Sequence, residues 1–172
     1  DAAMIQALNP NTTHLTINSY GKSDWDLIGA AISSHLPQLR GLCFSYYTLN
    51  GGGTHAIYSL LNIKGLRELT MGTDADSESL SITDKEAEFI AEHWKELTAL
   101  DLGKESQGGW NEFGVIGFAA IAKKCKNLKR LVIGKEFLDI DANESLGDEA
   151  VELIVQNLHK LESLEAWKCS IS

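Results

Sequence analysis

A cysteine, a histidine and an aspartate are the residues best suited to nucleophilic catalysis. Cys43 would be the nucleophile and His14 its activating base, since the two fall in neighbouring units of the repeat described below. Asp101 lies two strand spacings from Cys43, roughly 10 Å, which is too far to orient His14. A Cys–His pair on an open surface also lacks a pocket and an oxyanion site. We therefore predict no catalytic residues and no enzymatic activity.

Two acidic segments resemble the beginning of a calcium-binding loop. Residues 74–78 and 139–143 carry oxygen-bearing side chains at alternate positions. Their twelfth positions hold Lys85 and Ala150, where a calcium loop needs a bidentate glutamate, and their sixth positions lack the required glycine. We expect ordinary polar loops here, and we predict neither a metal site nor a cofactor.

One basic cluster raises the question of nucleic-acid binding. Its members are Lys123, Lys124, Lys126, Lys129 and Arg130. The cluster has no interleaved aromatic residues, and the sequence on either side of it is acidic. The chain has 15 Lys and Arg against 24 Asp and Glu, a net charge of −9, whereas a phosphate binder usually has a basic face. We interpret the cluster as a solvated helix end and predict no nucleic-acid partner.

Length and composition narrow the class of protein further. The 172 residues fit one domain. No apolar run approaches the roughly 20 residues that span a bilayer, so we predict no membrane partner. The three cysteines, Cys43, Cys125 and Cys169, are far apart and match no metal spacing. They suggest reduced thiols, and hence an intracellular, cytoplasmic protein.

The elements that must position these residues come from an internal repeat. Six segments share a pattern of the Leu-x-x-Leu-x-Leu type, and their first positions are separated by 27, 27, 31, 31 and 33 residues. The alternation of apolar residues predicts a short strand with one buried face in each unit. The six segments are 12–17, 39–44, 66–71, 97–102, 128–133 and 161–166.

A helix is predicted before each strand. The clearest apolar stripe, at helical spacing, consists of Ala87, Ile90, Ala91, Trp94 and Leu97. Ahead of it, Thr83 and Glu86 form a capping box that would satisfy the first free amides of the helix. The position seven residues before the strand segment holds isoleucine in five of the six units. We therefore interpret Trp94 as a core residue.

This pattern resembles the leucine-rich repeat family over essentially the whole chain. The unit lengths are most similar to the ribonuclease-inhibitor-like subclass, and residues 122–128 and 167–171 are similar to the cysteine-containing subclass of F-box proteins. The resemblance implies an α/β fold, a right-handed curved solenoid of about six repeats with parallel strands on the concave face and helices on the convex face. Each repeat would bury its apolar side against its neighbours.

One column departs from the family pattern. Three residues after the last strand apolar, the family places an inward Asn or Cys, whereas this chain has Tyr20, Tyr47, Asp74, Glu105, Glu136 and Cys169. Either the carboxylates there accept backbone amides as an Asn would, or the turns are rebuilt outward. Both ends also lack a polar cap, so we expect residues 1–172 to be one leucine-rich-repeat domain from a longer protein, with further repeats or a partner covering its ends.

The concave face is the surface on which this family usually binds its partners. Two columns would lie on it, at the third and fifth positions of the six segments, followed by polar and aromatic residues beyond the strands. Trp167 would either fill a pocket of a partner or be covered by a following repeat. The lysines at 104, 135 and 168 would either meet an acidic segment or be neutralised locally by glutamates. The predicted partner-binding residues are Tyr46, Glu68, Asp101, Lys104, Arg130, Lys135, Glu165, Trp167 and Lys168.

The resemblance predicts a non-catalytic scaffold that binds a protein or peptide on its concave strand face. Two alternatives stay open. The chain would be the substrate-recognition part of a larger ubiquitin-ligase receptor, or it would belong to a pathogen effector that uses a host-type repeat domain.

Overall fold

The computed structural model of this chain describes residues 2–20, 24–47, 53–60, 62–73, 82–102, 114–133 and 146–166. Helices and strands alternate along it. The helices are α1 (Ala2–Gln6), α2 (Trp25–His35), α3 (Gly53–Leu60), α4 (Asp84–His93), α5 (Val115–Lys124) and α6 (Leu146–Asn157). The strands are β1 (His14–Tyr20), β2 (Gly41–Tyr47), β3 (Glu68–Thr73), β4 (Ala99–Leu102), β5 (Arg130–Ile133) and β6 (Ser163–Ala166).

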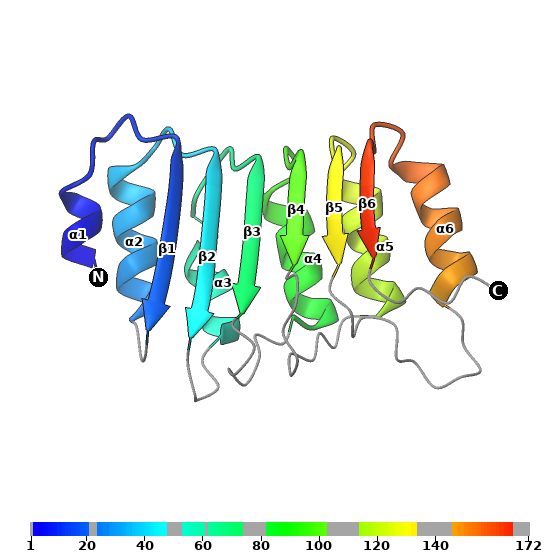
Figure 1. Cartoon of the computed structure of the whole chain (residues 1–172), viewed down its shortest axis with the longest axis horizontal. Coiled ribbons are helices and arrows are strands. Elements are labelled where there is room, and N and C mark those ends of the chain that lie inside the picture. Colours follow the sequence, from blue (N-terminus) through cyan, green and yellow to red (C-terminus); the bar gives the residue numbers. More distant parts are fainter. Residues whose placement is uncertain are drawn as a thin grey trace.

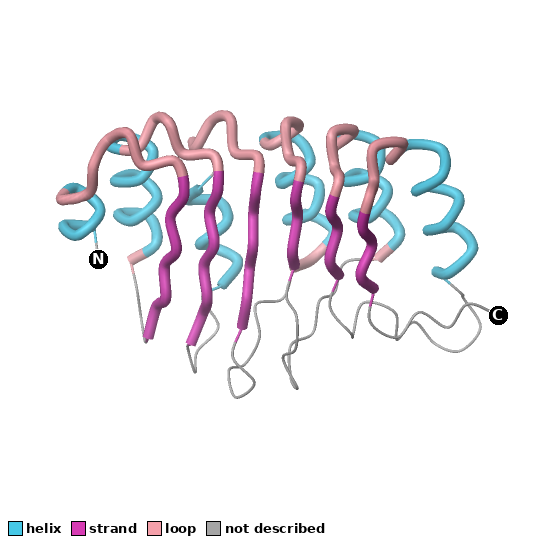
Figure 2. The backbone as a smooth tube through the Cα atoms, turned by 45° about the horizontal axis from the view of Figure 1, so that its top comes forward, coloured by secondary structure: helices cyan, strands magenta, loops and turns pink. Residues whose placement is uncertain are grey.

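Six parallel strands form one sheet in the described part of the chain, and they follow one another in sequence order from β1 to β6. The helices lie on one side of this sheet, as Figures 1 and 2 show. Every strand is joined to the next through a helix, as parallel strands require a long crossover connection. The predicted α/β class and all six strands are confirmed.

The predicted register is also confirmed. Leu15, Leu42 and Leu69 are paired across β1, β2 and β3, and Leu100, Leu131 and Leu164 continue the same row. The backbone just before each strand repeats one contact, in which a single carbonyl accepts two amides from the next unit. The carbonyl of Thr98, for example, accepts the amides of Lys129 and Arg130.

The core lies between the sheet and the helices. In the middle of the row, Leu69, Leu100 and Leu131 are almost completely buried. The whole predicted stripe of α4 is buried as well, and Trp94 is 2% exposed with its indole Nε1–H donating to the carbonyl of Ile63 at 2.9 Å. Trp94 is thus confirmed as a core residue. At the edge of the sheet Leu164 is 44% exposed, because no strand pairs with the far side of β6 in the described part.

The capping box of α4 is confirmed, and it also connects α4 to α3. Thr83 and Glu86 make both reciprocal contacts of the box. The buried Glu86 carboxylate additionally accepts the Tyr58 hydroxyl at 2.6 Å, and the Tyr58 ring meets Phe89 edge-to-face. Burial raises the pKa of Glu86, but the hydrogen bonds from Thr83 and Tyr58 outweigh burial and leave it lowered. The same hydrogen bond raises the pKa of Tyr58 to about 12.

We expect Tyr58→Phe to lower the free energy of unfolding by about 1.5 kcal/mol near neutral pH, because a hydrogen bond to a charged group is lost. The lowered pKa of Glu86 contributes stability above the ordinary Glu value of about 4.3, and this is lost as the pH falls through the folded value. The raised pKa of Tyr58 contributes stability below about 10, lost as the pH rises towards about 12. Urea unfolding across the pH range measures both effects: in the variant the alkaline effect should disappear with the phenol, and the acid effect should shrink. Unchanged profiles would contradict this role for the Tyr58–Glu86 contact.

Candidate functional site

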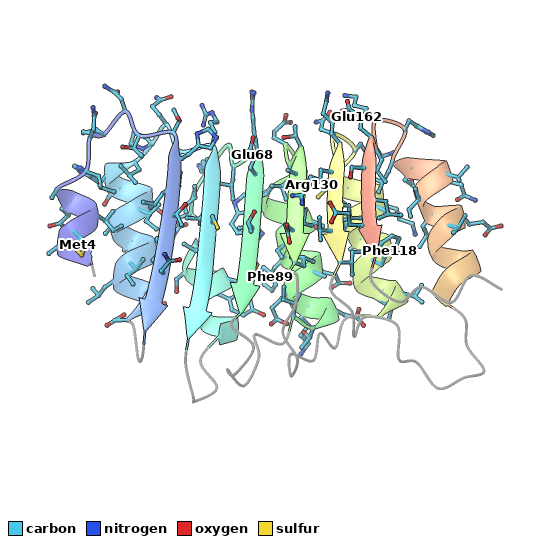
Figure 3. The ribbon with its side chains drawn as sticks, viewed as in Figure 1. Met4, Glu68, Phe89, Phe118, Arg130 and Glu162 are labelled. Carbon is cyan, nitrogen blue, oxygen red and sulfur yellow. The ribbon has the colours of Figure 1, made fainter. Side chains whose placement is uncertain are left out.

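The face of the sheet opposite the helices is the predicted binding surface, and we call it the open face. Two columns of side chains lie on it, because strand residues alternate with the buried row. The first column is His14, Gly41, Glu68, Ala99, Arg130 and Ser163, and the second is Thr16, Cys43, Thr70, Asp101, Val132 and Glu165. Figure 3 shows Glu68 and Arg130 on the side facing the viewer, with the helices behind the sheet.

One charged pair spans three strands at the β1 end of the open face. The Nε2 atom of His14 lies 3.6 Å from a carboxylate oxygen of Glu68, although β2 runs between their strands. Gly41 makes this possible, since a Cβ on it would lie 3.0 Å from His14 Nε2 and would overlap the ring. Both charged side chains are more than half exposed. The pair is an ion pair only while His14 is protonated.

A second charged group spans the other end of the open face. The Arg130 guanidinium lies 3.3 Å from Asp101 and 3.5 Å from Glu165, which come from the strands on either side of β5. Val132 stands between these two carboxylates in the register and is completely buried. Because Arg130 is itself a β5 residue, its guanidinium lies above β5 near Val132 and reaches both neighbouring strands. Asp101 is only 13% exposed.

The structure brings together three of the nine predicted binding residues, Asp101, Arg130 and Glu165, and places Glu68 on the same face with His14. Tyr46 lies in β2 and pairs with Ser19 and Thr73. The other four predicted residues, Lys104, Lys135, Trp167 and Lys168, lie outside the described residues. So do the two acidic segments and the departing carboxylates at 74, 105 and 136.

The structure does not align His14 with Cys43, although the catalytic hypothesis needed the two side chains to be neighbours. The register aligns Cys43 with Thr16, whereas His14 lies over Gly41 and contacts Glu68. Burial raises the pKa of the Cys43 thiol, and the negative charge of Asp101 raises it further. A thiol in such surroundings stays protonated and is a poor nucleophile. The sequence analysis did not predict the His14–Glu68 pair. The available signal was Gly41, which lies between His14 and Glu68 in the first column and leaves room for the contact.

We expect Asp101→Asn to lower the pKa of Cys43, because it removes the charge that adds to the effect of burial. At a pH just below the ordinary thiol pKa of about 8.5, Cys43 should then be alkylated faster. Mass-spectrometric mapping of the labelled peptide separates Cys43 from the other cysteines. Glu165→Gln is the matched control, since Glu165 lies in the same column beyond Val132. Equal rates for Asp101→Asn and wild type would refute the coupling.

Metal binding and membrane insertion find no support in the described residues. No cluster of three or more His, Cys, Asp or Glu side chains there is arranged to hold a metal ion. Among the described helices, none combines the length and apolar character needed to cross a bilayer. Of the five basic residues expected at a helix end, Lys123 and Lys124 lie in the last turn of α5, where Lys124 pairs with Glu92 of α4. The other three do not lie in the helix: Lys126 and Lys129 follow it, and Arg130 is the first residue of β5.

Comparison of the sequence with models of known families gives no match, and no curated protein matches it either. The functional interpretation therefore depends on the fold and the open face.

Proposed function

We propose that this chain is a non-catalytic protein-interaction module, an arc of a leucine-rich-repeat solenoid that binds a protein or peptide segment on its open face. One observation carries the proposal. All-parallel sheets are almost always covered on both faces, whereas here the described helices all lie on one side. A parallel sheet with an open polar face is the arrangement that the resemblance to leucine-rich repeats implies.

The chemistry of the open face supports binding. Its described side chains are mostly polar or charged, and six strands at about 4.8 Å spacing give it a width of roughly 24 Å, enough for a peptide or a small domain. Arg130 connects β5 to the strands on either side of it, and the contact between His14 and Glu68 reaches from β1 to β3. These contacts restrict the side chains that make them. A surface that is ordered before binding loses less side-chain entropy when a partner docks.

The raised pKa of Cys43 counts against thiol catalysis on this face, which is why binding is proposed here and catalysis is not. The narrower alternatives, a ubiquitin-ligase receptor or a pathogen effector, need a partner's identity to separate them. No observation on the described residues favours either one.

An affinity capture with two matched double variants tests the proposal. Glu68→Ala with Thr70→Tyr alters the open face, where Glu68 is exposed and Thr70 lies beside Asp101. Glu88→Ala with Lys85→Tyr makes similar changes at exposed positions of α4. Proteins retained by wild type and by the α4 variant should be lost by the open-face variant.

A substitution of Arg130 would be a poorer probe of binding. Loss of the guanidinium would leave the nearly buried Asp101 without its cation, so stability would change along with binding. The proposal fails if the three proteins, all equally folded by circular dichroism, capture the same partners. If the lost proteins include ubiquitin-ligase components, the receptor alternative is favoured.

A further inference from the structure

A second surface differs sharply in charge from the rest of the chain. The connections that lead from each helix to the next strand all lie where the strands begin, in a row that runs across the sheet, as Figures 1 and 2 show. We define the basic edge as residues 36–40, 62–67, 92–98, 123–129 and 158–162. Its cations are Arg40, Lys64, Arg67, Lys95, Lys123, Lys124, Lys126, Lys129 and Lys160.

The asymmetry of charge is large. The basic edge holds nine of the 15 Lys and Arg residues but only three of the 24 carboxylates, Glu92, Glu96 and Glu162. Its formal charge is +6, and the remaining residues together carry −15. In a chain with a net charge of −9, this concentration gives the edge a formal charge opposite in sign to that of the remaining residues taken together. The cluster near Lys126 is thus one part of a feature that extends over five units.

Helix dipoles explain only part of this arrangement. The helix C-termini point to this edge, and each carries a partial charge of about −0.5, which favours nearby cations. The effect falls off within the last turn, where Lys123 and Lys124 lie. Arg40, Arg67 and Lys129 directly precede the strands, beyond the helix ends. The five helices that end at the basic edge would offset about 2.5 of its six positive charges.

Several of these cations are free to meet a partner. Lys64, Arg67, Lys123 and Lys126 are exposed, and none of them makes an ion pair with any described residue. Two of the three carboxylates of the edge already pair with cations of the same edge. Glu92 contacts Lys95 and Lys124, and Glu162 pairs with Lys129 at 2.8 Å.

The cations also repeat in register. Lys64, Lys95 and Lys126 occupy the same position, two residues before the strand segment, in three successive units. Their units follow one another at the strand spacing of about 4.8 Å, so the five units of the basic edge span roughly 19 Å. An extended peptide of about six residues covers that length.

We infer that the basic edge docks an acidic segment of a partner protein, on a surface separate from the open face. The positive charge of the basic edge favours an anionic ligand, and the negative charge of the rest of the chain limits how long that ligand can be. A long nucleic acid would extend beyond the edge into the strongly negative remainder of the chain. The edge also presents no exposed Phe, Tyr or Trp among its described residues, whereas single-stranded nucleic acids are usually held by stacking on such rings.

Fluorescence anisotropy with a labelled peptide of about ten glutamates tests this inference, at an ionic strength of about 0.05 M, where screening is weak. The triple variant Lys64→Gln, Arg67→Gln, Lys126→Gln should bind about tenfold more weakly, since each exposed contact contributes modestly. Lys85→Gln is the control for charge alone, because Lys85 is exposed near the start of α4, away from the edge. It should bind as wild type does, and Lys126→Gln alone should bind more weakly than Lys85→Gln.

Three results would overturn the inference: no binding of the peptide, equal binding by wild type and the triple variant, or a DNA oligonucleotide of equal length that binds more tightly than the peptide and depends on the same three cations. The last result would make the edge a nucleic-acid site. The substituted side chains are all exposed, so the variants should fold, and a thermal melt followed by circular dichroism checks this.

Discussion

Replacing Trp94 by alanine should lower the free energy of unfolding by about 3–5 kcal/mol. The indole is 2% exposed in the centre of the core, so the substitution leaves a cavity that the neighbouring helices fill only in part. It also removes the donor to the buried carbonyl of Ile63, which then lacks its side-chain partner. Urea denaturation followed by circular dichroism measures the loss.

Trp94→Phe separates the two contributions. The smaller ring keeps part of the packing but cannot donate to Ile63, so its cost should fall between zero and that of the alanine variant. A loss below about 1 kcal/mol for Trp94→Ala would mean that the residue is not packed as described, and the arrangement of α4 against the sheet would be wrong.

Gly29→Ala in α2 should destabilise the protein by about 2 kcal/mol, the second largest effect we expect from a single substitution. Alanine favours a helix over glycine by up to about 1 kcal/mol, so a surface position would be stabilised. Here, however, the new Cβ would overlap the carbonyl oxygen of Ser59 and lie 2.6 Å from its carbonyl carbon, both in the backbone of α3. The two helices must move apart, which costs more than the helix propensity returns.

Gly114→Ala is the matched control for that experiment. A Cβ at Gly114 meets no atom within 4 Å, so no steric cost arises there. Gly114 is the N-cap of α5, where alanine is less favourable than glycine, so the change should cost about 0.5–1 kcal/mol, less than Gly29→Ala. Thermal or urea unfolding of both variants gives the comparison. Equal stability of wild type and Gly29→Ala would show that α2 and α3 are not in such close contact.

The sequence predicted the strands and their register because the apolar period is unambiguous. Six steps of leucine, any residue and a second apolar residue, all in one phase, permit a single pairing, and a slip by one residue would turn every leucine away from the helices. The ends of the strands were less well predicted. The first two residues of each predicted segment precede the strand, and β1 and β2 continue to Tyr20 and Tyr47, where the apolar pattern gives no signal.

The contacts on the open face were harder to predict than its columns. Arg130, Asp101 and Glu165 were each expected there. The orientation of Arg130, however, depends on how far its side chain reaches towards the two neighbouring strands, and the sequence does not give that information. The catalytic hypothesis, which the sequence analysis rejected, placed His14 beside Cys43, whereas the gap left by Gly41 directs His14 to Glu68. The basic edge was predicted only in part, as the cluster at residues 123–129, because its other cations lie in four other units of the repeat and only the stacking of units gathers them.

The most direct test of the proposed function places a photo-crosslinking amino acid at Thr70, in the middle of the open face, and in a second protein at Glu88, on the exposed surface of α4. Irradiation in a cell extract should give a discrete crosslinked partner from Thr70, and Glu88 should give none. Crosslinks from Glu88 with none from Thr70 would contradict the proposal, since the partner would then bind the helices and not the sheet.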